Sequence, residues 1–227
     1  MTDQALFDEW PERYEGWFST PIGRLVKETE CRLVMEMLAP AVGEKIFDAG
    51  CGTGVFTMDY LAAGAEVVGL DISQPMLDMA ARKLSDYPFL AVQGDMLCLP
   101  FEDDSFDKAV SVTALEFIED ARRAIDELFR ITKPGGVVVV ATLNSLSSWA
   151  ARRRAKTARG QRHVLEGAFF RSPEELLAYS PVGGVAASVV HFQKDDPPER
   201  AAETERLGQA QGLDTGAFIA ARWVKPR

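Results

Sequence analysis

The sequence is poor in the residues that build disulfide-linked or metal-held scaffolds. It holds 3 cysteines, Cys31, Cys51 and Cys98, which are widely separated and include no C-x-x-C pair. A disulfide framework or a zinc knuckle requires paired cysteines, so neither is indicated. Only 2 histidines occur, His163 and His191, which argues against a multi-histidine metal site. We therefore expect reduced cysteines and no metal.

An excess of positive charge and long apolar runs are also missing. The formal net charge is −9, from 25 Lys and Arg against 34 Asp and Glu. Nucleic acid is therefore not an expected partner, because binding to its phosphates requires a basic face. The longest apolar run, residues 137–143, is too short to span a bilayer, and residues 1–10 lack the features of a secretory signal. We expect a soluble, cytoplasmic protein; the sequence leaves its oligomeric state open.

Strands and helices alternate between residues 45 and 143. Short apolar segments predict strands at 45–49, 66–72, 89–93, 107–112 and 137–142. Ser73 and Asp120 are each expected to cap a following helix, and the Lys-Pro-Gly-Gly segment at 133–136 predicts a turn. This alternation predicts a Rossmann-like α/β fold, with a mostly parallel sheet and helices on both faces.

The pattern changes after Leu143. A Ser-Pro-Glu-Glu capping box at 172–175 predicts the start of another helix. Two late strands, 185–192 and 217–224, are separated by a polar segment that reads as a long loop, and we expect them to form a terminal antiparallel pair. The sheet would then have seven strands. With 227 residues and 47% hydrophobic residues, the chain is expected to form a single domain.

A glycine-rich turn follows the first strand, in the segment Asp48-Ala-Gly-Cys-Gly-Thr-Gly54. Three glycines at alternate positions let the backbone approach a ligand without obstruction by a Cβ. The helix after the turn begins with free N–H groups and about half a positive charge. The turn therefore suits an anionic group, such as the carboxylate of a cofactor.

Two cofactor classes compete for this turn. A dinucleotide fingerprint requires G-x-G-x-x-G. Counted from Gly50, the last glycine position holds Val55, and counted from Gly52 it holds Thr57, so the spacing fails. Asp48 would repel a pyrophosphate but would suit the α-amino group of an amino-acid moiety. The residues thus favour a cofactor that carries an amino acid.

The turn resembles motif I of class I S-adenosylmethionine-dependent methyltransferases, particularly the type 11 group, which includes ubiquinone and menaquinone biosynthesis enzymes. Gly69-Leu-Asp71, Gly94-Asp-Met96 and Lys133-Pro-Gly-Gly136 agree with this family in order and spacing. The resemblance covers residues 44–143. It implies S-adenosylmethionine as the cofactor. The cofactor-binding residues that it implies are Tyr14, Asp48, Ala49, Gly50, Cys51, Gly52, Gly54, Asp71, Ile72, Met76, Gly94, Asp95, Met96 and Thr113.

The resemblance also assigns roles within this set. Asp71 would hold the ribose hydroxyls, Asp95 would meet the adenine edge, and residues 113–116 would line the methionine end of the cofactor. Tyr14 lies in a segment that resembles a lid over the cofactor. The single domain 1–227 would consist of an N-terminal lid with helices (1–40), a cofactor-binding core (44–143) and a substrate-side segment with the last two strands (144–227).

One strongly basic stretch, Arg152-Arg-Arg-Ala-Lys156 with Arg159 and Arg162, stands out in this acidic chain. It is either a solvated surface segment or a site for an anionic substrate, since in this family the region after the fifth strand helps to form the substrate pocket. His163 follows it and could act as a base, although a lone histidine is more often structural.

The resemblance implies methyl transfer from S-adenosylmethionine to a small-molecule acceptor. No residue stands out as a general base, so the catalytic residues are left unassigned. Two alternatives remain: a catalytically silent module that binds the adenosyl cofactor, and a nucleotide-dependent reductase, which the glycine spacing opposes. The sequence does not identify the acceptor.

Overall fold

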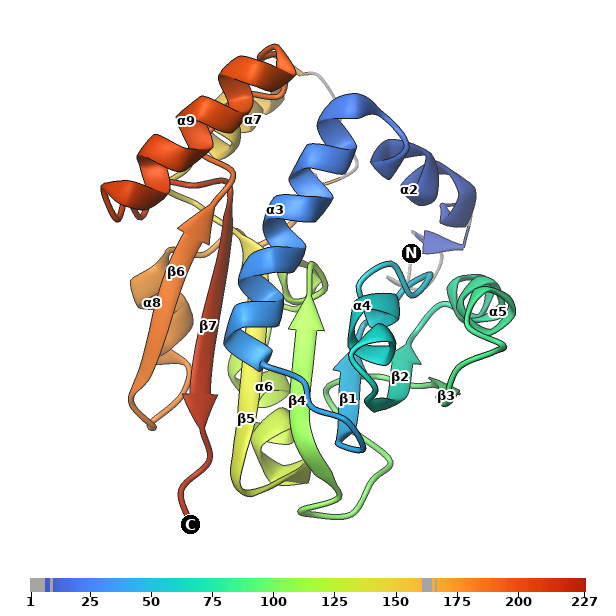
Figure 1. The fold of residues 1–227 in the computed structure, drawn as a ribbon. Coiled ribbons are helices and arrows are strands. Elements are labelled where there is room, and N and C mark those ends of the chain that lie inside the picture. Colours follow the sequence, from blue (N-terminus) through green and yellow to red (C-terminus); the bar gives the residue numbers. More distant parts are fainter. Residues whose placement is uncertain (1–6, 9, 161–164, 166) are drawn as a thin grey trace.

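The computed structural model describes residues 7, 8, 10–160, 165 and 167–227. Within them, seven strands form one sheet in the order β3-β2-β1-β4-β5-β7-β6 (Figure 1). The strands are β1 (Lys45–Ala49), β2 (Glu66–Asp71), β3 (Phe89–Gln93), β4 (Phe106–Val112), β5 (Thr132–Leu143), β6 (Gly184–Val189) and β7 (Phe218–Val224). Strands β1 to β5 pair in parallel, whereas β7 is antiparallel to both β5 and β6. The predicted fold class, including the antiparallel pair, is confirmed.

Helices cover both faces of this sheet. One face carries α3 (Pro21–Leu38), α4 (Thr57–Ala62) and α9 (Pro198–Ala210), and the other carries α6 (Ala121–Ile131) and α8 (Pro173–Ala178). In Figure 1, α3 crosses in front of the sheet, and α6 and α8 lie behind it. The helix α5 (Gln74–Lys83) packs against β2 and β3. Among the described residues, none of the helices combines the length and apolar character that crossing a bilayer requires.

The central strands are buried on both faces, which explains their unbroken apolar runs. Successive side chains of a strand point to opposite faces, so each central strand supplies two cores. Ile46 and Val139 belong to the core beneath α3, whereas Phe47 and Val138 belong to the core beneath α6. All four side chains are fully buried.

The predicted long polar loop between the last two strands is wrong, because this segment contains α9. Pro198 occupies the first turn of the helix, where a missing N–H is tolerated. The buried positions of α9 are Ala201, Glu205 and Gly208, a small or charged set that gives little apolar periodicity in the sequence. Glu205 accepts a hydrogen bond from the backbone N–H of His191 (2.6 Å), so tertiary contacts hold this helix in place.

Two strand ends differ from the predicted ones by more than one residue. The structure begins β5 at Thr132, because Thr132 already pairs with Phe106; the expected turn at 133–136 forms an irregularity within the strand before the register resumes. The predicted strand 185–192 ends at Val189, because Val190 has a φ of 67° and interrupts the extended backbone.

Two of the three predicted helix N-caps are confirmed. The Asp120 side chain accepts a hydrogen bond from the backbone N–H of Arg123, and the capping box at 172–175 is complete. Ser73 does stand at the N-cap position of α5, but its side chain does not cap the helix. Its hydroxyl donates to the carboxylate of Asp8 instead (2.8 Å), an interaction between segments 65 residues apart.

Candidate active site

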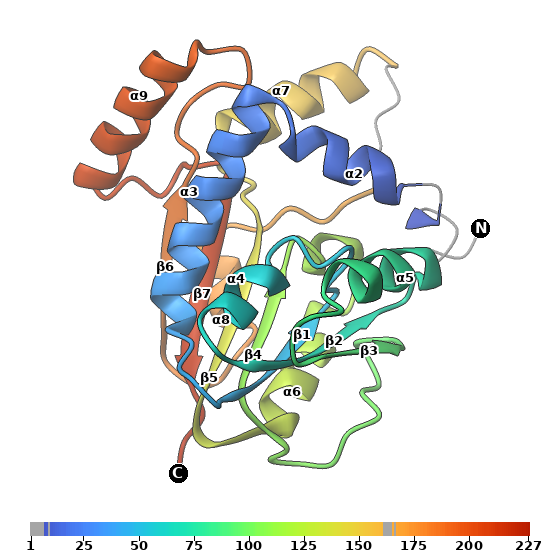
Figure 2. The ribbon, with the colours of Figure 1, turned by 45° about the vertical axis from the view of Figure 1, so that its right-hand side comes forward.

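A large cavity lies at the edge of the sheet where the parallel strands end. Its volume is about 1200 Å³, and residues after β1, β2, β3 and β4 line it. Two further helices, α2 (Pro11–Phe18) and α7 (Ser148–Thr157), supply the residues of its outer wall. Figure 2 shows both helices beyond the carboxyl ends of the strands. Ligands bind at this edge in open α/β sheets.

The three glycines of the turn have different surroundings. All adopt left-handed backbone conformations, with φ of 74° at Gly50, 53° at Gly52 and 76° at Gly54. A Cβ at Gly50 would overlap Ala114, and a Cβ at Gly54 would lie 2.8 Å from Leu84 of the α5 end. At Gly52, a Cβ would meet no heavy atom of the described residues within 4 Å. Gly52 therefore keeps space open beside the cavity, whereas Gly54 lets the turn pack on α5.

Asp71 links the end of β2 to the glycine turn. Its two carboxylate oxygens accept hydrogen bonds from the backbone N–H groups of Gly52 and Ser73, both at 2.9 Å. Burial raises the pKa of this carboxyl, and the backbone hydrogen bonds oppose that shift. The backbone N–H of Ile72 also bonds to this carboxylate. A carboxylate offers about four acceptor positions, so Asp71 can still accept from a ligand hydroxyl.

Asp48 is more enclosed, with 2% of its surface exposed. It accepts a hydrogen bond from the hydroxyl of Thr57 (2.7 Å), and burial raises its pKa to about 7. A buried carboxyl that borders a cavity is a natural partner for an ammonium group, because pairing with a cation offsets the loss of solvation.

Most of the predicted cofactor-binding residues border this one cavity. The lining set comprises Tyr14, Asp48, Gly50, Cys51, Gly52, Asp71, Ile72, Met76, Gly94, Asp95, Met96 and Thr113. Ala49 and Gly54 do not line it. Ala49 is fully buried in β1, with its carbonyl accepting from the Ser111 hydroxyl, and Gly54 faces Leu84.

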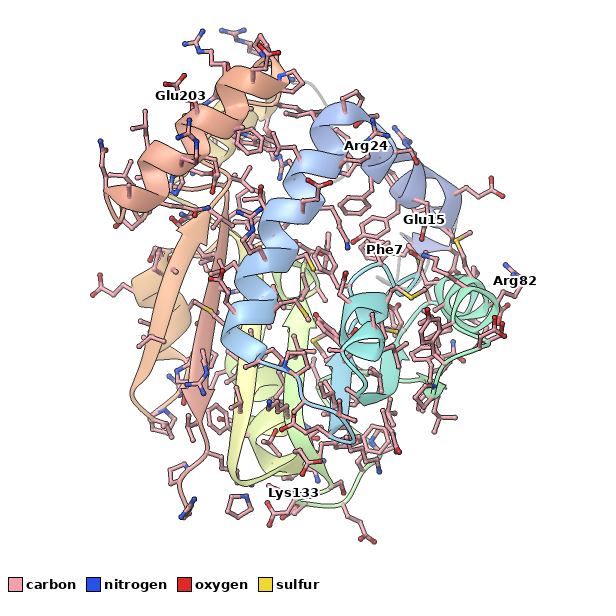
Figure 3. The ribbon with its side chains drawn as sticks, in the orientation of Figure 1. Phe7, Glu15, Arg24, Arg82, Lys133 and Glu203 are labelled. Atoms are coloured by element: carbon pink, nitrogen blue, oxygen red, sulfur yellow. The ribbon has the colours of Figure 1, made fainter. Side chains whose placement is uncertain are left out.

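The predicted lid segment is fastened to the turn by polar contacts. The Glu15 carboxylate accepts a hydrogen bond from the hydroxyl of Thr53 (2.6 Å) and forms an ion pair with Lys83 of α5. Figure 3 shows Glu15 on the side of α2 that faces α5. A hydrogen bond joins the side chains of Tyr14 and Thr113, and the rings of Phe7 and Phe117 are in edge contact.

Two buried acids line the cavity: Glu116 lies within the predicted stretch 113–116, whereas Glu30 was not predicted from the sequence. Glu30 of α3 and Glu116 are 6% and 1% exposed, and burial raises the pKa of Glu30 to about 8 and that of Glu116 to about 7. The negative charge of Glu116 further raises the pKa of Glu30. Glu116 accepts a hydrogen bond from the Thr142 hydroxyl (2.9 Å). In the sequence, Glu30 reads as an ordinary acid of an amphipathic helix, which gives no sign of its burial.

The basic stretch divides between the cavity and the solvent. Arg152, Arg153 and Lys156 line the cavity, whereas Arg154 and Arg159 are exposed and do not. Arg162 and His163 lie outside the described residues. The interpretation as a site for an anionic substrate can therefore concern only the three members that line the cavity.

The residues at this edge fit S-adenosylmethionine. The open space beside Gly52 and the spare acceptor positions of Asp71 suit a ligand that carries vicinal hydroxyls. Asp48 suits the ammonium of its amino-acid part, while Ile72 and Met96 supply apolar lining for a ring.

Comparison with known proteins agrees with this geometry. A family model described as "Methyltransferase domain" matches residues 47–140. Demethylmenaquinone methyltransferase of Renibacterium salmoninarum is 39% identical over 110 residues, covering 48% of this chain and 46% of that protein. Malonyl-[acyl-carrier protein] O-methyltransferase of Yersinia pestis is 32% identical over 160 residues, covering 70% of this chain and 57% of that protein. The chain thus spans about half the length of these curated relatives.

Solved structures share the fold along nearly the whole chain. A SAM-dependent methyltransferase from Thermotoga maritima has a TM-score of 0.76 at 22% identity, covering 98% of this chain and 99% of that one. Phosphoethanolamine N-methyltransferase 2 of Haemonchus contortus, in complex with S-adenosyl-L-methionine, has a TM-score of 0.65 at 17% identity, covering 100% of this chain and 60% of that one. The cofactor that the family match indicates is S-adenosylmethionine. Residues 47–140 match the methyltransferase domain family, and the chain carries the Rossmann-like fold of S-adenosylmethionine-dependent methyltransferases.

Proposed function

We propose that this protein transfers a methyl group from S-adenosylmethionine to a small-molecule acceptor. The observation that carries the proposal is the pairing of Gly52 with Asp71 at the cavity edge, with open space beside the glycine and spare acceptor positions on the acid. The family match at residues 47–140 supports the same reaction class.

The cofactor residues would be divided along the cavity. Asp71, Ile72 and Asp95 would hold the adenosine part, and Asp48, Gly50 and Gly52 the amino-acid part. The remaining members of the predicted set, Tyr14, Cys51, Met76, Gly94, Met96 and Thr113, would complete the wall around it. When bound, S-adenosylmethionine supplies a methyl group that is already activated for transfer.

The main work of the protein is therefore to place an acceptor and to exclude water. Holding two reactants in a reactive geometry can supply roughly 7–11 kcal/mol of the barrier. The helix α2 and the aromatic side chains of Trp17, Phe18 and Trp149 border the cavity and can shield it from solvent. The contacts of Glu15 with Thr53 and Lys83 keep α2 in that position.

Glu30 and Glu116 supply a place for a proton, should the acceptor lose one. A general base works best when its pKa lies near the operating pH. Burial brings the pKa values of these two acids to about 8 and about 7, and both acids line the cavity. We assign Glu116, positioned by the Thr142 hydroxyl, as the proton acceptor near neutral pH. Glu30, with the higher pKa, is mostly protonated there and could accept a proton only at higher pH.

Turnover provides the test. S-adenosylhomocysteine release is measured with a panel of phenols, amines, thiols and carboxylic acids, for the wild type, Asp71→Asn and the control Asp78→Asn, an exposed acid outside the cavity. We expect turnover with at least one acceptor, lost in Asp71→Asn and retained in Asp78→Asn. Binding of S-adenosylhomocysteine with no turnover across the panel would favour the silent cofactor-binding alternative.

A further inference from the structure

A group of positive side chains lines the part of the cavity that is formed by α7 and the segment after β6, called here the cationic end. Arg152, Arg153 and Lys156 come from α7, and Lys194 comes from the segment after β6. This grouping is unusual in a chain whose net charge is −9. Like charges that share one site repel each other, so the grouping costs free energy unless an anion offsets it.

Only one of these cations has a partner of opposite charge in the part of the chain that the structure describes. Arg152 forms a two-pronged ion pair with Asp195, at 2.6 and 3.1 Å. No ion pair involves Arg153, Lys156 or Lys194 among the described residues. Three positive side chains of the described residues thus line the cavity without forming an ion pair.

Arg153 is the member of the group whose surroundings most strongly indicate a missing anion. Its Nη1 atom is buried and has no hydrogen-bond partner among the described residues. The guanidinium stacks over the Phe170 ring at 4.8 Å, and burial lowers the pKa of Arg153. A buried donor on a charged group that lacks an acceptor is costly. The charge of Glu116 acts on Arg153, but Glu116 itself is bonded to Thr142.

Lys194 is held beside the same group of cations. Its Nζ lies over the Trp17 ring, 4.1 Å from the centroid. Burial lowers the pKa of Lys194, and the charges of Arg153, Lys156 and Arg152 lower it further. This mutual influence shows that the four cations act on one region of the cavity, whose wall also contains the indole of Trp149.

From these contacts we infer that the cationic end of the cavity binds a carboxylate or phosphate group of a small molecule with an apolar or aromatic body, Arg153 being the principal contact. An arginine presents donors in a fork that matches either anion. The aromatic walls suit the rest of such a molecule. The inference rests on the proposed methyl transfer only in taking this molecule as the methyl acceptor. The binding itself is tested without turnover.

The test compares three probes of the same body: 2-naphthoate, 2-naphthyl phosphate and the neutral 2-naphthamide. Calorimetry measures their affinities for the full chain, with and without saturating S-adenosylhomocysteine. The variants are Arg153→Gln and the control Arg154→Gln. The exposed Arg154 side chain donates a hydrogen bond to the Ser145 carbonyl and is not part of the cavity lining among the described residues. Melting temperature and S-adenosylhomocysteine affinity are measured on the same samples.

We expect the wild type and Arg154→Gln to bind at least one anionic probe about tenfold or more tightly than the amide, as one charge-assisted hydrogen bond provides. In Arg153→Gln the ratio of anion affinity to amide affinity should fall towards one, while the melting temperature stays the same or rises and S-adenosylhomocysteine affinity is unchanged. Equal affinities for anion and amide in the wild type, or an undiminished preference in Arg153→Gln, would overturn the inference. Failure of the wild type to bind S-adenosylhomocysteine would instead overturn the proposed function. The preference for an anionic probe over the amide would still be measured in the samples that contain no S-adenosylhomocysteine.

Discussion

Alanine at each glycine of the turn should separate the requirements of folding from those of cofactor binding. Gly50, Gly52 and Gly54 all have positive φ, so each substitution costs roughly 1–2 kcal/mol of backbone strain. The surroundings of the added Cβ differ: Ala114 at Gly50, the flexible end of Leu84 at Gly54, and open space at Gly52. The three variants therefore share the cost of backbone strain and differ in what the added Cβ contacts.

The second cost can be assigned from the contacts. At Gly50 the Cβ meets the Cβ of Ala114, which is fixed to the backbone, so overpacking adds roughly 1–3 kcal/mol to the loss of stability. At Gly52 the added Cβ causes no overpacking, so it does not destabilise the folded chain further, but it occupies space beside the cavity. There it should weaken cofactor binding by roughly 1–3 kcal/mol, or about 5- to 150-fold. At Gly54 the Leu84 side chain can shift, and the cavity is untouched.

Thermal unfolding and calorimetric titration with S-adenosylhomocysteine read the two costs separately. Gly50→Ala should lower the melting temperature most, by ~4–20 °C, given about 2–4 °C per kcal/mol for a chain of this size. Gly52→Ala should lower it least and lose the most affinity, whereas Gly54→Ala should keep wild-type affinity. Wild-type affinity in Gly52→Ala, or an equal loss in Gly54→Ala, would refute the placement of the cofactor against Gly52.

Three further predictions follow from the same contacts. Asp71→Asn should lower S-adenosylhomocysteine affinity about tenfold or more, because it replaces a charged acceptor and turns an amide group towards the Gly52 N–H. Calorimetry with Asp78→Asn as control checks this, and equal affinities of Asp71→Asn and the wild type would contradict it. Glu30 has a pKa of about 8 in the folded chain against an ordinary 4.5, so its burial lowers stability as pH rises from about 4.5 through 8. Glu30→Gln should therefore raise the melting temperature at pH ~9 and leave it nearly unchanged at pH ~5. A shift of the same size at both pH values would count against a buried, protonated Glu30. Glu15→Gln removes the ion pair with Lys83 and weakens the bond to Thr53; stopped-flow measurement should show faster dissociation of S-adenosylhomocysteine, and an unchanged rate would show that α2 does not retain the ligand.

The sequence brings most of the predicted cofactor-binding residues to one cavity, because local signals determine where each strand ends. Each strand between residues 45 and 143 ends in a short polar or glycine-rich segment, and parallel pairing brings those ends to one edge. Gly50, Gly52 and Asp71 could therefore be placed together before any contact was known. Only Ala49 and Gly54 of the predicted set do not line the cavity, because a side chain in a strand or a packed turn can face away from its neighbours.

The side of the cavity that Glu30, Glu116 and Arg153 line depends on contacts between distant segments, which no local pattern records. Glu30 and Glu116 are separated by 86 positions in the chain numbering, and their burial results from the packing of α3 and the segment after β4 around one cavity. The contact of Ser73 with Asp8 and the helix α9 have the same origin. For Arg153, the sequence shows a charge in a basic stretch, but not that its neighbour Arg154 faces solvent while it faces the cavity.

The most direct test of the central claim is calorimetric titration of the wild-type chain with S-adenosylmethionine and S-adenosylhomocysteine, with NADH as a control. The structure predicts micromolar binding of both adenosyl ligands at one site per chain and no binding of NADH, because the turn at residues 48–54 lacks the dinucleotide spacing and carries Asp48. Binding of NADH alone, or of none of the three, would contradict the account.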